Sequence, residues 1–223
     1  RFGNAGLPVG GFGEIDDLLA GYRETSGFDV DRQELEFWQV FGSFWWAMAT
    51  LQMANAWRTG ETPSLERPVI GRRSSEAQMD CVNLLIPGDF SLPEPGKAIS
   101  EGTRLPMPAE LLAGVADFLK DELAPRLDSH DSFLARVAAN SLGIAQREFQ
   151  YGPELTTREM TRLKSLLGSD GELDALRWEL VNQLRKGLAL DTPGLAEHLR
   201  QTVAGQLMVD QPRYSALAIR DTC

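Results

Sequence analysis

The feature that most limits what this chain can fold into is an uncharged segment of 21 residues, from Phe37 to Trp57. Its aromatic residues are Phe37, Trp38, Phe41, Phe44, Trp45, Trp46 and Trp57. The apolar spacing predicts one long helix that begins after Asp31 and ends at Trp57. A helix with this much apolar surface needs cover on nearly every side. We expect the natural cover to lie before Arg1, in sequence that precedes this chain.

The same segment is long enough to cross a bilayer, so a membrane helix is the first alternative. Its polar positions are Gln39, Ser43, Gln52 and Asn55. The aromatic residues fill the middle of the segment instead of forming belts at its ends. Amide side chains that face lipid lack hydrogen-bond partners. We therefore predict a buried core helix and no membrane partner.

Charge and cysteine content exclude other classes of protein. The chain has 22 Lys and Arg against 32 Asp and Glu, and its net charge of -10 disfavours binding to nucleic acid or anionic lipid. Its two cysteines, Cys81 and Cys223, lack the spacing of a zinc site. The first residues contain no apolar signal segment. We expect a cytoplasmic protein without nucleic-acid partners or structural metal.

Helical periodicity predicts an all-α fold in two parts. In residues 1–86 we expect helices at 14–25, 31–57 and 68–86. Five prolines between residues 87 and 108 predict a linker over 87–107. In residues 108–215 the apolar repeats predict a separate bundle-like domain with helices near 108–124, 133–145, 156–167, 173–184 and 193–207. The third helix of this bundle would start at a capping box formed by Thr156 and Glu159.

No set of residues forms a recognisable active site, so we predict no catalytic residue, metal ligand or cofactor ligand in this chain. Arg72 and Arg73 are the strongest candidates for an anion site, since adjacent guanidinium groups can hold phosphate or carboxylate. The same two arginines could equally pair with Glu66 and Glu76. The sequence leaves these alternatives open.

Trp45 and Trp46 are the candidates for a ligand pocket, although their helical neighbours favour packing in a core. Asn140 interrupts an apolar helix face, where a buried amide can fix the register of two helices. We expect His198 at the surface or half-buried, since no second ligand is placed to share a metal with it.

Several motifs in order along the chain carry a family resemblance. They are Arg1-Phe2-Gly3, Pro8-Val9-Gly10-Gly11-Phe12-Gly13, Phe37-Trp38-Gln39-Val40-Phe41-Gly42 and Ile70-Gly71-Arg72-Arg73. Together they resemble the end of the C-terminal lobe of aminoglycoside/choline-kinase-like phosphotransferases, over about residues 1–86. The most similar branch is encoded beside, or fused to, acyl-CoA dehydrogenases. Residues 108–214 resemble a helical domain of unknown function that accompanies them, through Arg136-Val137-Ala138-Ala139-Asn140 and Asp210-Gln211-Pro212-Arg213-Tyr214.

In that family a His-Gly-Asp motif, a following Asn and a magnesium-binding Asp do the chemistry, and all of them precede the segment that begins at Arg1. The resemblance therefore implies the non-catalytic C-terminal portion of an ATP-dependent phosphotransferase that acts on a small-molecule hydroxyl group. ATP and magnesium belong to the complete family member. This chain has Trp45 where the family usually has a basic residue, so the resemblance assigns no acceptor contact to that helix.

The partners that follow from this interpretation are an upstream catalytic domain or another protein chain, with an acyl-CoA dehydrogenase as a further candidate. The alternative is an independent all-α interaction or dimerisation module, which would expose the Trp-rich helix to a second chain or form a homodimer.

Overall fold

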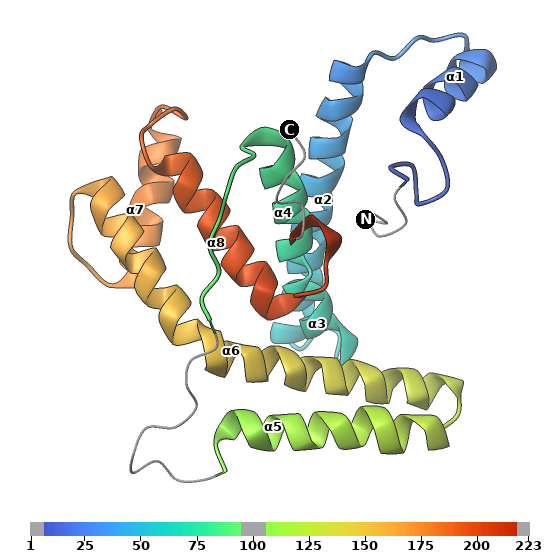
Figure 1. Ribbon diagram of the computed structural model, residues 1–223, viewed down its shortest axis with the longest axis vertical. Helices are drawn as coiled ribbons and strands as arrows, with labels where there is room; N and C mark the ends of the chain where they lie inside the picture. Colours follow the sequence, from blue (N-terminus) through green and yellow to red (C-terminus); the bar gives the residue numbers. More distant parts are fainter. Residues whose placement is uncertain (1–6, 95–105, 218–223) are drawn as a thin grey trace.

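The computed structural model describes residues 7–94 and 106–217, and these form helices, turns and one isolated β-bridge without any strand (Figure 1). The predicted all-α fold class is confirmed. The α-helices are α1 (Ile15–Ser26), α2 (Arg32–Arg58), α3 (Glu66–Arg72), α4 (Ser74–Leu85), α5 (Pro108–Asp117), α6 (Ser129–Leu167), α7 (Leu173–Arg185) and α8 (Leu195–Asp210). The short turns are the π-helical η2 (Phe118–Leu123) and the 3-10 helices η3 (Ala124–Arg126) and η4 (Ser215–Leu217).

The long helix α2 begins and ends within one residue of the prediction. The Asp31 carboxylate caps it by accepting a hydrogen bond from the Glu34 backbone N–H at 2.7 Å. One face of α2 packs against α3 and α4, and Ala47 and Thr50 are buried there. The opposite face carries exposed aromatic side chains. Within the described residues α2 is thus covered on one face only, and the expectation that further cover comes from outside this chain stays a prediction.

The predicted helix at 68–86 is divided at Arg73 into α3 and α4. The Arg73 backbone N–H bonds to the Ile70 carbonyl, and the Ser75 hydroxyl donates to the Arg72 carbonyl at 3.0 Å. These local bonds compete with the regular helical ladder and allow the break. Two residues before this break, a Cβ atom added to Gly71 would lie 2.3 Å from the Cβ atom of Ala54, so glycine lets α3 approach α2 closely.

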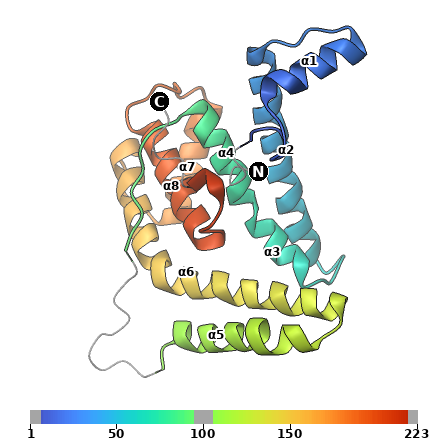
Figure 2. The same ribbon diagram turned by 45° about the vertical axis from the view of Figure 1, so that its right-hand side comes forward.

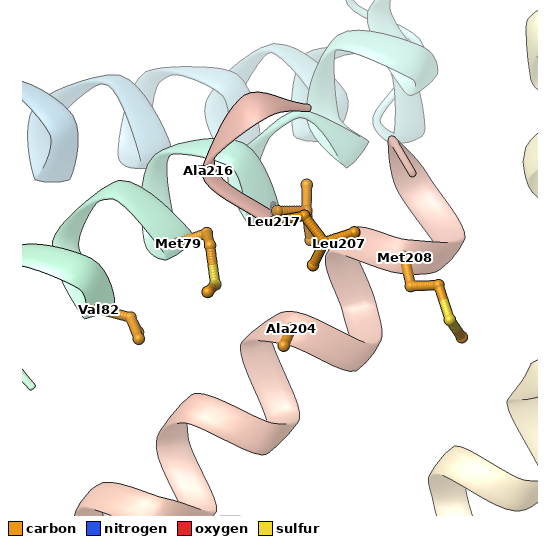
Figure 3. Packing of buried hydrophobic residues seen from close by; sticks show 7 residues of the cluster. All are labelled: Met79, Val82, Ala204, Leu207, Met208, Ala216 and Leu217. Carbon is orange, nitrogen blue, oxygen red and sulfur yellow. The ribbon is translucent and has the colours of Figure 1, made fainter. Parts of the chain in front are cut away.

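The two predicted domains share a hydrophobic core. Met79 and Val82 of α4 pack with α8 and with the segment that follows it (Figure 3). The buried cluster consists of Met79, Val82, Ala204, Leu207, Met208, Ala216 and Leu217. The predicted division into residues 1–86 and residues 108–215 therefore does not coincide with a division between two cores.

The first residues of the predicted linker lie against α8. Phe90 and Leu92 pack on the shared core, and the Ser91 backbone N–H donates to the Gln201 side chain at 3.2 Å. Arg200 of α8 donates to the Ile86 carbonyl at 3.1 Å. Residues 87–94 are thus part of the packed structure, and the rest of the predicted linker, 95–105, lies outside the described residues.

The helices predicted at 133–145 and 156–167 form one continuous helix, α6. Pro153 lies inside it, and α6 bends between the arm beside α5 and the arm beside α7 (Figure 1). A proline cannot donate to the helical ladder, and it kinks a helix that tertiary contacts preserve. The predicted capping box is wrong, because Thr156 and Glu159 lie in the interior of α6.

The C-terminal arm of α6 forms a second core with α7 and α8 around Leu163, Leu176, Leu180 and Leu195. Helix α1 lies at the far end of α2, away from the C-terminal helices (Figure 2), and has no buried residue. Its Asp16 carboxylate is paired with Arg32 at 2.5 Å. Among the helices of residues 7–94 and 106–217, none has the length and apolar content needed to span a bilayer.

Candidate functional site

Helix α2 presents Trp45 to solvent and leaves Trp46 half-buried. Both tryptophans, together with Trp38, line a shallow surface hollow along the helix. The remaining lining residues are Gln39, Gly42 and Ser43. The favoured prediction of core packing is therefore wrong for Trp45, and the two side chains contribute to an open surface instead.

The exposed face of α2 has the spacing of a seam between two helices. Phe37, Phe41, Phe44, Met48 and Leu51 succeed one another at alternating intervals of four and three residues. This average of about 3.5 residues keeps side chains facing a partner helix. The five side chains are between 44% and 60% exposed. We call this set the aromatic seam.

The rings of the aromatic seam are already ordered by one another. Phe37 stacks on Phe41 with ring centroids 6.3 Å apart, and Trp38 meets Phe41 edge-on at 5.7 Å. Contiguous exposed apolar surface of this kind marks a contact site in a folded protein. The sequence showed how apolar the segment is, and the four-three spacing was the signal that one face of it forms a seam.

Arg72 and Arg73 turn towards different carboxylates. Arg72 pairs with Glu148 of α6 and, at 2.5 Å, with Asp210 of α8. Arg73 donates two hydrogen bonds to Glu76 at 3.0 and 3.1 Å, which was one of the predicted alternatives. The two guanidinium groups therefore do not form a joint anion site in this structure.

Asp210 is the centre of a buried polar cluster where α3, α6 and α8 meet. Its side chain is only 4% exposed, and it accepts hydrogen bonds from the Gln206 amide at 3.0 and 3.1 Å. Burial raises the pKa of Asp210, and Arg72, Gln206 and Ser75 partly offset this rise. Burial opposes the charge on Arg72 as well, but the charges of Asp210 and Glu148 prevail and raise its pKa. The cluster joins three helices through charge.

The segment that follows α8 is also bonded to the N-terminal half of the chain, through α4. The Tyr214 hydroxyl is bonded to the Asp80 carboxylate at 2.9 and 3.1 Å, and the Asn83 amide donates to the Ala216 carbonyl at 3.0 Å. Asp210 and Tyr214, the two ends of a motif singled out in the sequence, therefore both hold the α3 and α4 region.

A second hollow lies between η2 and α6 and has a volume of about 480 Å³. Arg136, Asn140 and Arg147 line it from one face of α6, and Arg213 lines it from the segment after α8. Asn140 was predicted to be a buried amide that fixes helix register, but it is half-buried at this hollow. We call this hollow the arginine cleft.

His198 is buried between α6, α7 and α8, and the prediction of a surface or half-buried position is wrong. Burial lowers its pKa, and the charges of Arg162 and Arg177 lower it further although Glu159 opposes them. Glu159 is bound by Arg177 of α7 through two hydrogen bonds of 2.6 and 2.8 Å. Across residues 7–94 and 106–217, no group of three or more His, Cys, Asp or Glu side chains is placed to hold a metal ion.

Comparison with known proteins places part of this chain in context. Residues 125–214 match a family model described as a domain of unknown function (DUF6285), and this range contains α6, α7 and α8. No curated protein and no solved structure matches the chain. The chain is thus similar to that domain family over the region that supplies Asp210 and the α6 wall of the arginine cleft.

Proposed function

We propose that this chain is the non-catalytic C-terminal portion of an ATP-dependent phosphotransferase that transfers a phosphoryl group to a hydroxyl group of a small molecule. The aromatic seam is the observation that carries the proposal, because it is a ready contact surface for a helix of the catalytic region. The ordered motifs of residues 1–86, which resemble the end of a phosphotransferase C-terminal lobe, support the same interpretation.

Burial of the aromatic seam would contribute favourable free energy to a contact between two segments. Full burial of a Phe, Leu or Met side chain contributes about 1.5 to 3 kcal/mol, and the seam has five such residues that are only partly covered. Their spacing suits a helix better than a strand or loop as the partner. The catalytic region would supply the ligands for ATP and magnesium, and α2 would support it from behind.

The acceptor in this proposal is a small hydroxylated molecule. An acyl thioester that bears a hydroxyl group fits the association with acyl-CoA dehydrogenases that the resemblance implies. The helices α6, α7 and α8 would then be an accessory region attached to the lobe through the shared core and the Asp210 cluster.

The intact mass of the native protein in its source cells tests this proposal, with detection through the C-terminal helices. We expect a mass well above the 24.6 kDa of this chain, and phosphoryl transfer from ATP to hydroxylated substrates by the isolated native protein. The recombinant chain of 223 residues serves as the size standard. A native mass equal to that standard would contradict the proposal.

A homodimer through the same seam is the second candidate function, and the charges at the two ends of the seam favour it. The alternating spacing extends to Glu34 before Phe37 and to Arg58 at the end of α2. In an antiparallel pair of α2 helices, Glu34 of each copy would lie near Arg58 of the other. Such a pairing is self-complementary, as a two-fold symmetric interface requires.

Sedimentation velocity of the purified 223-residue chain tests the homodimer. Glu34→Arg should weaken self-association by about threefold to tenfold, since it places two like-charge contacts at the interface. The double variant with Glu34→Arg and Arg58→Glu should restore it. Glu36→Arg, which lies off the seam, is the matched control. If the chain stays monomeric at every concentration, the homodimer is excluded and the aromatic seam remains assigned to the catalytic region.

A further inference from the structure

The arginine cleft gathers positive charge in a chain whose net charge is -10. Its cations are Lys120, Arg136, Arg147 and Arg213, and its carboxylates are Asp117 and Asp121. Lys120 pairs with Asp121 at 3.5 Å. Within residues 7–94 and 106–217, Arg136, Arg147 and Arg213 form no ion pair with a carboxylate. The cleft therefore has three arginines that, among the described residues, are not in direct contact with a carboxylate, although Asp210 acts on Arg147 from nearby.

Arg147 is held in place by neutral acceptors. Its Nε atom donates to the Val209 carbonyl at 2.6 Å, and its Nη2 atom lies 3.4 Å from the Asp210 carbonyl oxygen. A Cβ atom added to Gly143, one turn earlier, would lie 3.2 Å from Nη1 of Arg147. Glycine inside a helix costs about 1 kcal/mol relative to alanine, and here it leaves room for the guanidinium group.

Within the cleft, the charge of Arg213 repels that of Arg147. Burial lowers the pKa of Arg147, the charge of Asp210 opposes this, and the charges of Arg213 and Arg72 add to the lowering. An anion placed between Arg147 and Arg213 would remove this repulsion. Arginine suits a phosphoryl group because its planar fork of N–H donors matches two phosphate oxygens at once.

The opposite wall is the π-helical turn η2, which follows α5. Such turns are rare, and they occur frequently at functional sites. This wall supplies Lys120 and Asp121, and the preceding residue Asp117 also lines the cleft. Carboxylates there can accept hydrogen bonds from hydroxyl groups of a molecule whose charged end faces the arginines.

We propose that the arginine cleft binds a small phosphomonoester through its phosphoryl group, with Arg136, Arg147 and Arg213 as the phosphoryl ligands. The inference does not depend on what covers the aromatic seam, since the two surfaces share no residue. It assigns a binding role to the region that matches the domain of unknown function.

Calorimetric titration of the 223-residue chain with inorganic phosphate and with glycerol 3-phosphate tests the proposal. We expect saturable binding of both, and no binding of glycerol. The double variant Arg136→Gln with Arg213→Gln should weaken both by about tenfold or more, because it removes two charge-assisted contacts. Arg185→Gln, an exposed arginine of α7, should leave both affinities within about twofold.

Thermal unfolding without ligand separates binding from folding. Arg213→Gln should raise the melting temperature by about 1 to 2 °C, because it removes a repulsive charge from the empty cleft. If Arg213 had a purely structural role, the same substitution would lower the melting temperature. Absence of saturable binding by both phosphates would overturn the proposal. Unchanged affinity in the double variant, or exclusion of glycerol 3-phosphate while inorganic phosphate binds, would also overturn it.

Discussion

Leu207→Ala is expected to lower the free energy of unfolding by about 3 to 5 kcal/mol. Leu207 lies on α8 and is 0% exposed, and its cluster includes Met79 and Val82 of α4 (Figure 3). Truncation removes buried methyl groups and leaves a cavity between helices that come from both halves of the sequence. The substitution should therefore lower the stability of the whole molecule and not only that of the C-terminal helices.

Chemical denaturation followed by circular dichroism and by tryptophan fluorescence measures this effect. Four of the five tryptophans lie on α2, so fluorescence mainly reports the N-terminal half. With one shared core, the two transitions should coincide and move together in the variant. Leu190→Ala, at a side chain that is 82% exposed, should change stability by less than about 0.5 kcal/mol. An unmoved fluorescence transition would mean that residues 1–86 and 108–215 unfold as separate domains.

Local signals explain which helices could be predicted from the sequence. Helix α2 follows its cap at Asp31, and α7 (Leu173–Arg185) was predicted at 173–184 from its leucine spacing. Helix α6 was divided in error because its first apolar repeat ended at Ala145 and because Thr156 with Glu159 resembled the start of a new helix. Packing of its two arms against α5 on one side and against α7 and α8 on the other keeps it continuous. Tertiary contacts of this kind have no signature in the local sequence.

The ion pairs also divide into local pairs, which the sequence can indicate, and long-range pairs, which it cannot. The pairing of Arg73 with Glu76 spans three positions on one helix turn, so it could be proposed from the sequence. Arg72 pairs with Glu148, which is 76 residues away, and with Asp210, which is further still. Such long-range partners depend on the whole arrangement of α3, α6 and α8.

Only one wall of the arginine cleft could be predicted from the sequence. Arg136 and Asn140 are four residues apart, so one face of a predicted helix already contained both. Arg213 reaches the same hollow only because α8 returns along α6, and the wall opposite depends on a π-helical turn. Because these features are tertiary, the cleft could not be proposed before the fold was known.

Arg72→Met is expected to lower the free energy of unfolding by about 2 to 3 kcal/mol near neutral pH. The change keeps most of the side-chain volume but leaves the buried Asp210 carboxylate without its arginine partner. Loss of one partner of a buried pair costs about 3 to 5 kcal/mol. The smaller value applies here because the Arg72 side chain is 38% exposed and partly screened by solvent.

The pH dependence of this loss identifies its cause. The pKa of Asp210 is already raised in the folded protein, and removal of Arg72 should raise it further. On acidification the folded state then takes up a proton before the unfolded state does, so the variant gains stability relative to the wild type as pH falls. The deficit should therefore shrink between about pH 7 and about pH 5, as measured by urea denaturation at each pH.

Arg158→Met is the matched control for this experiment. The Arg158 side chain is 37% exposed, close to that of Arg72, but its partner Glu154 is 52% exposed. A surface pair of this kind contributes less than about 0.5 kcal/mol, and its removal should show no such pH dependence. If the deficit of Arg72→Met stayed constant across the pH range, the loss would come from packing of the arginine side chain. Asp210 would then be a neutral acid in the wild-type fold, and the attachment of α3 to α8 would rest on hydrogen bonds instead of charge.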